Sequence, residues 1–186
     1  MLFRSVEVEN QRNRLFIKKE DQIPFSFGGN KVRIAASYFK DLISDDCDTV
    51  ITYGSSSSNL CRVVANMAKR YGIQCVIVSP EEEYKETPNS IIVKSLDAEI
   101  VTCSLNSVSS TISRITEERA ADGKPYFIYG GGHGALGTES YRAVLRQIVE
   151  YEKKNGIVFD LVFITLATGT SMSGMIVENE IGRAHV

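Results

Sequence analysis

Short apolar runs alternate along the chain with longer segments in which apolar residues recur at helical spacing. The apolar runs are rich in β-branched and aromatic residues, as buried strands are, and lie at 48–53, 74–80, 98–103, 125–130 and 160–167. The amphipathic segments predict helices at 58–71, 88–96, 106–121 and 138–154. This alternation predicts an α/β protein with mostly parallel sheets and helices on both faces.

Local signals support the helix boundaries. Gly72 follows the first of these helices and suits a C-cap. Pro88 stands near the first turn of the second helix, where its missing N–H has no cost. Thr138 is the expected N-cap of the last helix.

Composition and charge exclude several classes of protein. The chain has 186 residues with a net charge of −2 and no basic run, which argues against nucleic acid or an anionic membrane as a partner. No apolar stretch reaches the roughly 20 residues that span a bilayer, and the start lacks the apolar core of a secretory signal. The four cysteines form no CxxC pair and only two histidines occur, which predicts a reduced, cytoplasmic protein without a metal site.

Both ends of the chain share an unusual property at the level of possible codons. Residues 1–5 (MLFRS) and 181–186 (IGRAHV) can be encoded by one stretch of DNA read in opposite directions, and that stretch resembles a common sequencing-library adapter. We therefore expect both ends to be adapter-derived and the natural protein to continue beyond residue 180. On this hypothesis His133 is the single natural histidine.

Four loops are built from small or polar residues. GSSSSN follows residue 53, GGGHGALG follows residue 129 and TGTSMSG follows residue 167, while FSFGGNKVR precedes them all. In open parallel sheets, ligands collect at the carboxyl ends of the strands. The loops therefore predict a ligand site.

Two of these loops carry recognisable chemistry. In FSFGGNKVR, Gly28 and Gly29 remove side-chain bulk just before Asn30 and Lys31. A lysine in a dry cleft loses part of its preference for the charged form, so its amine becomes nucleophilic; a solvated lysine at a helix start is the alternative. Residues 168–171, between a strand and a helix, form a candidate phosphate site, with a plain turn as the alternative.

The lysine loop and the serine loop together resemble one known family. GGNKVR is similar to the (S/G)GNKxR segment of D-cysteine desulfhydrases and 1-aminocyclopropane-1-carboxylate (ACC) deaminases, which depend on pyridoxal 5′-phosphate (PLP). The resemblance implies that Lys31 forms the Schiff base with PLP and that Asn30 belongs to the cofactor site. GSSSSN is similar to the family's G-x-x-x-S-N loop. This implies that Asn59 bonds the ring hydroxyl of PLP and that Ser58 contacts substrate and assists proton transfer.

The later motifs follow in the family's order. ATGTSMSG is similar to the phosphate loop GTGGT(I/V)xG of the wider class, which implies phosphate contacts from Thr168, Gly169, Thr170 and Ser171. GGGHGALGTESY resembles the family's glycine-rich turn before a helix that bears Tyr141.

Four positions depart from the family pattern and leave the exact substrate open. Ile34 stands where a second basic residue is usual, and Thr170 replaces a glycine of the phosphate loop. Ser57 replaces the glutamine of the usual QSN sequence, and His133 stands where desulfhydrases have serine. Ser57, Ser58 and His133 are the candidate substrate contacts, with bracing of the turn as the alternative for His133.

The resemblance covers about residues 14–178 and implies the tryptophan synthase β-like fold, which has two α/β/α three-layer domains with PLP in the cleft between them. Residues 1–42 and 128–186 would form an incomplete larger domain, and residues 43–127 the smaller one. With the C-terminal part of the larger domain missing, we expect exposed apolar surface. The full-length protein is expected to be a homodimer.

The function implied is that of a PLP-dependent deaminase, lyase or hydrolase that acts on a small amino acid. A β-replacement enzyme similar to cysteine synthase, or another ammonia-lyase, is the alternative within the class. A Rossmann-like nucleotide-binding module is the alternative outside it, and would need GxGxxG after the first strand, where GSSSSN stands.

Overall fold

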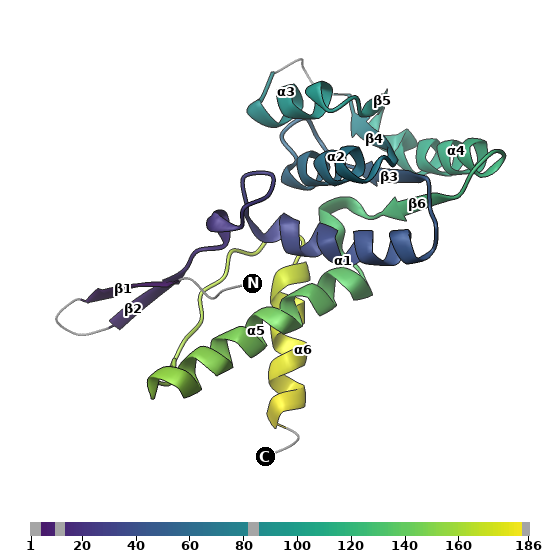
Figure 1. Cartoon of the computed structure of the whole chain (residues 1–186). Coiled ribbons are helices and arrows are strands. Elements are labelled where there is room, and N and C mark those ends of the chain that lie inside the picture. The colour runs from purple at the N-terminus through teal and green to yellow at the C-terminus, as the bar shows by residue number, and fades with distance from the viewer. Residues whose placement is uncertain (1–4, 10–13, 82–85, 184–186) are drawn as a thin grey trace.

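The computed structural model describes residues 5–9, 14–81 and 86–183, and one part of it is built around a four-stranded sheet (Figure 1). The strands are β3 (Thr49–Tyr53), β4 (Gln74–Pro80), β5 (Glu99–Cys103) and β6 (Pro125–Ile128). Their spatial order is β5-β4-β3-β6, and every pairing among them is parallel. The predicted α/β class with a parallel sheet is confirmed.

Helices cover both faces of this sheet. The connections between the strands contain α2 (Asn59–Tyr71), α3 (Pro88–Ser95) and α4 (Val108–Ala120). Neighbouring residues of a strand point to opposite faces. Val50 accordingly packs in a core cluster with residues of α2, whereas Ile51 packs in a second cluster with Ile115 of α4.

The ends of α2 and α3 follow from local chemistry. Ser58 caps α2 by accepting a hydrogen bond from the N–H of Cys61 at 3.2 Å, and Gly72 closes it in the left-handed conformation. Thr87 and Ser90 cap α3 reciprocally, with Pro88 in its first turn. The sequence predictions for Gly72 and Pro88 are confirmed.

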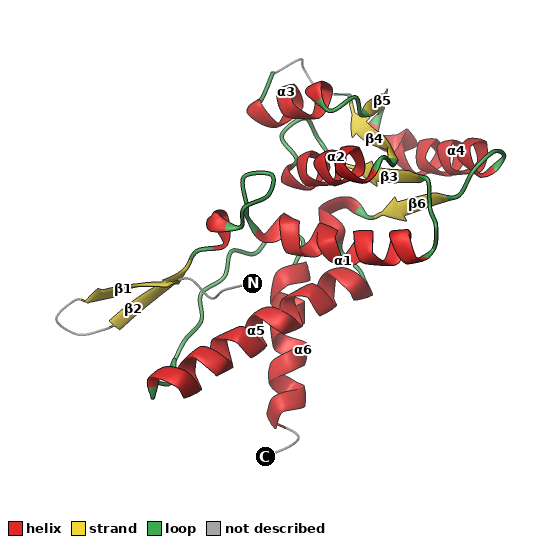
Figure 2. Cartoon of the chain, viewed as in Figure 1, coloured by secondary structure: helices red, strands yellow, loops and turns green. Residues whose placement is uncertain are grey.

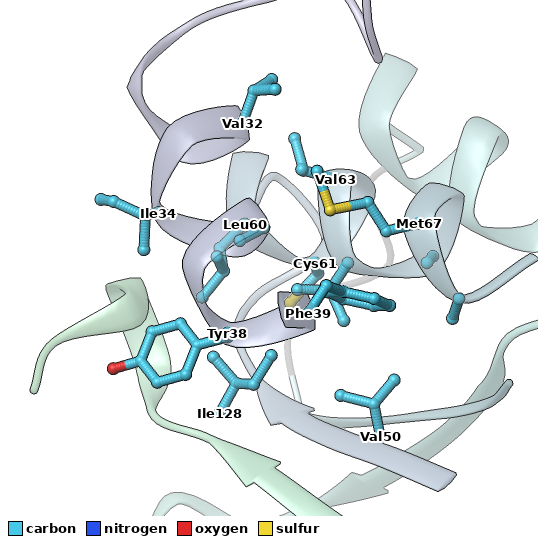
Figure 3. Packing of buried hydrophobic residues seen from close by; sticks show 14 of the residues in the cluster. Val32, Ile34, Tyr38, Phe39, Val50, Leu60, Cys61, Val63, Met67 and Ile128 are labelled. Carbon is cyan, nitrogen blue, oxygen red and sulfur yellow. The ribbon is translucent and has the colours of Figure 1, made fainter. Parts of the chain in front are cut away.

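The helix α1 (Asn30–Ser44) packs on α2 and supplies much of the main core (Figure 3). Ile34 and Phe39 of α1 meet Leu60 of α2 and Ile128 of β6, and each of the four side chains is at most 2% exposed. Burial of one such side chain stabilises the fold by about 1.5–3 kcal/mol. The same cluster continues into α5, so it joins the sheet to the C-terminal helices.

The remaining elements extend away from the sheet (Figures 1 and 2). β1 (Ser5–Glu9) and β2 (Arg14–Lys18) pair as an antiparallel hairpin, and α5 (Ala135–Asn155) packs against both α1 and α6 (Thr170–Arg183). Short 3-10 turns lie at η1 (Glu20–Gln22), η2 (Leu105–Ser107) and η3 (Gly130–Gly132).

Two predictions about the second half of the chain are wrong. The apolar run 160–167 forms no strand, because no described strand lies beside it to pair with its N–H and C=O groups. The last predicted helix begins at Ala135, where Gly134 takes the cap position and accepts a hydrogen bond from the N–H of Thr138 at 3.0 Å. Thr138 is therefore inside the helix and does not cap it.

Two further expectations are left open by the fold. The division into residues 43–127 and the rest stays a prediction, since the main core cluster crosses both proposed boundaries. Of the two ends expected to be adapter-derived, residues 1–4 and 184–186 lie outside the described residues.

Candidate cofactor site

Lys31 lies in the first turn of α1, which begins at Asn30 after two glycines with positive φ. A Cβ at Gly28 would lie 2.2 Å from the backbone oxygen of Asp21, so only glycine fits this approach. Gly29, with φ +90°, is the residue from which α1 starts. The doubled glycine thus fixes where the backbone of Lys31 stands.

The amine of Lys31 is held inside the protein. Its Nζ donates a hydrogen bond to the carbonyl of Gly131 in η3 at 2.6 Å. Burial lowers the pKa of Lys31, and no described charge opposes that effect. A lowered pKa increases the share of free, nucleophilic amine near neutral pH.

The start of α6 offers a group of hydrogen-bond donors. Gly169, with φ +83°, precedes Thr170 and Ser171, both of which are buried. The hydroxyl oxygens of Thr168 and Thr170 are 3.2 Å apart, and Asn30 donates from Nδ2 to the Ser171 hydroxyl at 3.3 Å. The first N–H groups of a helix and its dipole attract anions such as phosphate.

These two features line one cleft of about 560 Å³. Its wall contains Asn30, Lys31, Asn59 and residues 162–172. A Cβ on Gly131 would meet the Cγ2 of Thr168 at 2.3 Å, so the turn that accepts from Lys31 lies against the candidate phosphate loop. The structure therefore brings the predicted cofactor-binding residues together: Asn30, Lys31, Asn59, Thr168, Gly169, Thr170 and Ser171. Their individual roles toward PLP stay predictions.

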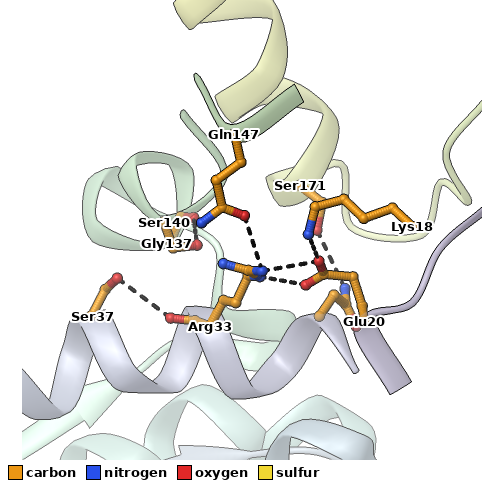
Figure 4. Close-up of polar contacts among 9 residues, drawn as sticks. Lys18, Glu20, Arg33, Ser37, Gly137, Ser140, Gln147 and Ser171 are labelled. Carbon is orange, nitrogen blue, oxygen red and sulfur yellow. Dashed lines mark hydrogen bonds and ion pairs between the residues drawn. The ribbon is translucent and has the colours of Figure 1, made fainter. Parts of the chain in front are cut away.

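A cluster of charges, of which Lys18 and Glu20 line this cleft, was not predicted from the sequence (Figure 4). Glu20 pairs with both Lys18 and Arg33, and Arg33 also donates to the side chain of Gln147 at 3.3 Å. Burial raises the pKa of Glu20, but hydrogen bonds from Arg33 and Lys18 outweigh it and hold that pKa below its ordinary value. Two cations against one carboxylate leave positive charge near the start of α6, which favours an anion there.

Tyr141 of α5 lies at the wall of the same cleft. Burial raises its pKa to about 12, the negative charge of Glu20 acts in the same direction, and a hydrogen bond with Ser171 opposes them. Tyr141 therefore stays a neutral phenol at neutral pH. The resemblance had already placed a tyrosine on this helix.

The serine loop divides between two cavities. Asn59 lines the cleft, whereas Ser58 lines a smaller neighbouring cavity of about 210 Å³, which also contains Val93 of α3. The Ser58 hydroxyl caps α2. Ser57 is exposed, with its hydroxyl 3.1 Å from that of Ser55. The structure thus does not bring Ser57 and Ser58 to the wall of the cleft.

His133 is also outside the wall of the cleft. Its side chain is exposed, its Nδ1 lies 2.7 Å from the carbonyl of Gly130, and its ring centroid is 5.1 Å from that of Tyr129. Tyr38 donates to the His133 carbonyl at 2.8 Å. These contacts are those of a residue that braces the glycine turn.

The residues of the cleft fit PLP. The Lys31 amine, with its lowered pKa, can attack an aldehyde, and the start of α6, with two buried hydroxyl groups, can bind a phosphate. Asn59, at the start of α2, adds a polar residue to the lining of the cleft. Fold and site together define a PLP-type α/β protein.

The chain belongs to the pyridoxal-phosphate dependent enzyme family, which it matches over residues 2–183. It is similar to a D-cysteine desulfhydrase from Serratia proteamaculans, with 27% identity over 171 residues, and to an ACC deaminase from Methylobacterium sp. (strain 4-46), with 30% identity over 178 residues. Each alignment covers 88% of this chain and 52% of the relative. The family resemblance inferred from the motifs is confirmed, and the nucleotide-binding alternative loses its support.

Solved structures agree with this assignment. An ACC deaminase homologue superposes with a TM-score of 0.81 at 25% identity, over 91% of this chain and 52% of that structure. A cysteine synthase from Entamoeba histolytica superposes with a TM-score of 0.71 at 15% identity, over 97% of this chain and 54% of that structure, which shows a common fold. The tryptophan synthase β-like architecture predicted from the motifs is confirmed.

The chain spans about half the length of the relatives it matches. In the described part of the chain, no helix combines the length and the apolar character needed to cross a membrane.

Proposed function

We propose that the protein acts as a PLP-dependent deaminase or lyase on a small amino acid, similar to D-cysteine desulfhydrase or ACC deaminase. One observation carries this proposal: the half-buried Nζ of Lys31 and the start of α6 line a single cleft. The names of the relatives, desulfhydrase and deaminase, support the same activities. They give no support to the broader hydrolase label.

Lys31 has the central role in the proposed mechanism. When bound, PLP supplies an aldehyde that a lysine amine can attack and a ring that accepts electrons from a bond to the amino acid's α-carbon. Lys31 would hold the cofactor through its Nζ, and burial, which lowers its pKa, favours the free amine that accepts a proton. Residues 168–171 hold the phosphate, and Lys18 and Arg33 add positive charge nearby.

Asn59 and Tyr141 would complete the polar surroundings of the ring and the substrate. Asn59 would bond the ring hydroxyl, and Tyr141, kept neutral by its raised pKa, would supply a phenol from the wall of the same cleft. Ser58, whose hydroxyl accepts from the Cys61 N–H and which lines the neighbouring cavity, is the proposed residue for substrate contact and proton transfer. Ser57 and His133 are the weaker candidates for substrate contact, because one is bonded to Ser55 and the other braces its turn.

A β-replacement enzyme is the second candidate within the family. The superposition on a cysteine synthase supports the shared fold alone, since the identity is 15%. The relatives at 27–30% identity carry deaminase and desulfhydrase names, so the first proposal is favoured. A cytoplasmic location and a homodimer of the full-length protein belong to the same proposal; the four buried, free cysteines agree with a reducing compartment.

The direct test is the visible absorption of the purified chain after incubation with PLP. We expect a band from lysine-bound PLP in the wild type and its loss in Lys31→Ala. The matched control is Lys40→Ala, at an exposed position of the same helix, which should keep the band. Retention of the band and of PLP in Lys31→Ala would contradict the proposal.

A further inference from the structure

The first turn of α3 holds the serine loop from outside the cleft. Thr87 donates from its hydroxyl to the carbonyl of Ser56 at 2.7 Å. Asn89 donates from Nδ2 to two acceptors, the carbonyl of Ser57 at 2.7 Å and the Oδ1 of Asn59 at 3.1 Å. Asn89 thus bonds both the backbone of the loop and the side chain that lines the cleft.

Arg62 of α2 sets the orientation of the Asn89 amide. Its Nη1 donates to the Oδ1 of Asn89 at 3.0 Å. A guanidinium group has donors and no acceptor, so it can face the oxygen of the amide and not the nitrogen. The Asn89 nitrogen is therefore directed to the serine loop.

The hydrogen bond from Asn89 sets the orientation of the Asn59 amide in the same way. The Oδ1 of Asn59 accepts a hydrogen bond from Asn89, so the oxygen of the Asn59 amide already has a partner. The amide nitrogen, which is a donor, is the atom left for a ligand. Asn59 lines the cleft together with Lys31. An amide that presents N–H to the cleft suits an oxygen acceptor, such as the ring oxygen of a pyridoxal.

Arg62 also reaches the lysine loop. Its guanidinium carbon lies 5.6 Å from the ring centroid of Phe27, which stands just before Gly28 in that loop. The guanidinium group of Arg62 therefore contacts both Phe27, in the loop that carries Lys31, and Asn89 of α3, which bonds Asn59. Contacts through Arg62 and Asn89 thus connect the lysine loop with Asn59.

We propose that Asn89, oriented by Arg62, is a positioning residue that fixes the Asn59 amide with its nitrogen toward the cleft. This inference rests on the proposed PLP function for its ligand, and on the described contacts for its geometry. Asn89 does not line the cleft itself, so it acts through Asn59.

The test is Asn89→Asp, which keeps the shape of the side chain and the contact with Arg62. A carboxylate cannot donate to the Oδ1 of Asn59, so the Asn59 amide is expected to turn over and present its oxygen to the cleft. The matched control is Asn106→Asp, the same change at an exposed residue of η2. Both variants should keep the backbone amide spectrum of the folded chain.

Two measurements, of the Asn59 amide signals and of PLP binding, test the effect of Asn89→Asp. In nitrogen-15 spectra without PLP, the side-chain amide signals of Asn59, assigned by their loss in Asn59→Asp, should move in Asn89→Asp and stay in place in Asn106→Asp. With PLP, Asn89→Asp should weaken binding about tenfold and shift the visible band, because an oxygen would then face the ring oxygen. Unmoved Asn59 signals in Asn89→Asp would overturn the positioning role.

The failure of the proposed function has a different signature. If the wild type gives no Lys31-dependent band with PLP, the cofactor assignment fails. The spectra of the chain without PLP still decide whether Asn89 sets the Asn59 amide.

Discussion

Two apolar runs of similar composition differ in structure: one forms a strand and the other does not. β3 (Thr49–Tyr53) pairs with β4 on one side and β6 on the other, and its Val50 and Ile51 are fully buried. Segment 160–167 is at least as apolar, yet it pairs with no described strand and its Phe163 is 83% exposed. An apolar run therefore predicts a strand only when the fold supplies a neighbouring strand to pair with it.

The physical reason lies in the backbone as much as in the side chains. A strand leaves its N–H and C=O groups unpaired until another strand lies 4.7–4.9 Å away, and isolated strands gain too little to offset their lost conformational entropy. α1, α2 and α4 also cover β3 from both faces, whereas segment 160–167 has partial cover from the cluster that includes Ile164.

The largest expected effect comes from a matched pair of leucine substitutions. Leu60→Ala removes a side chain that is 1% exposed between α1 and α2 and should lower the free energy of unfolding by about 2–5 kcal/mol. Leu161→Ala, at a position 73% exposed, should change it by less than about 0.5 kcal/mol. Urea titration followed by circular dichroism measures both. Equal losses would show that segment 160–167 is packed and would break the comparison.

A smaller effect is expected where α6 crosses α5. A Cβ on Gly174 would lie 2.2 Å from the carbonyl of Thr138 and 2.7 Å from the Cβ of Tyr141. Gly174→Ala should therefore destabilise the chain by about 1–3 kcal/mol and loosen the helix whose start forms the phosphate site. Gly182→Ala, in the same helix with nothing within 4 Å, should be neutral or slightly stabilising. Thermal unfolding distinguishes them, and a neutral Gly174→Ala would contradict the close crossing.

The smallest effect concerns Glu20 and its ion pairs at the cleft. The pKa of Glu20 is lowered in the folded chain, so its ion pairs stabilise the fold above the ordinary carboxyl pKa near 4.5 and are lost as pH falls through the lowered value. Glu20→Gln should cost roughly 1 kcal/mol at pH 7, and its difference from the wild type should shrink at pH 3. Glu118→Gln, which breaks an exposed pair with Arg114, should show less than about 0.5 kcal/mol at either pH. A Glu20→Gln difference that is independent of pH would argue against the ion cluster.

Much of the sheet region could be predicted because its signals are local. Gly72 closes α2 in the left-handed conformation, and Pro88 lies in the first turn of α3, as the sequence indicated. The start of α5 could not be predicted in the same way. The helix begins after Gly134, whose φ is +128°, and Gly137 inside it packs against Thr170 of α6, where a Cβ would lie 2.8 Å away; no local signal indicates this contact.

The candidate site also contains residues that the sequence predicts and residues that it does not. The order of motifs was enough to place Lys31 and residues 168–171 together, and the structure puts them in one cleft. The Glu20–Arg33 pair joins η1 to α1 across 13 positions without any repeating pattern, so no sequence rule indicates it. Asn89 stands in the first turn of α3, and its contacts with the serine loop depend on how α3 docks.

The central claim, that Lys31 is the amine that holds the cofactor, can be tested by trapping. The chain is incubated with PLP, reduced with borohydride and digested, and the labelled lysine is located by mass spectrometry. We predict that most of the label lies on Lys31, ahead of Lys18 in the same cleft and of exposed Lys40. A label found mainly on Lys18 or spread over exposed lysines would contradict the account.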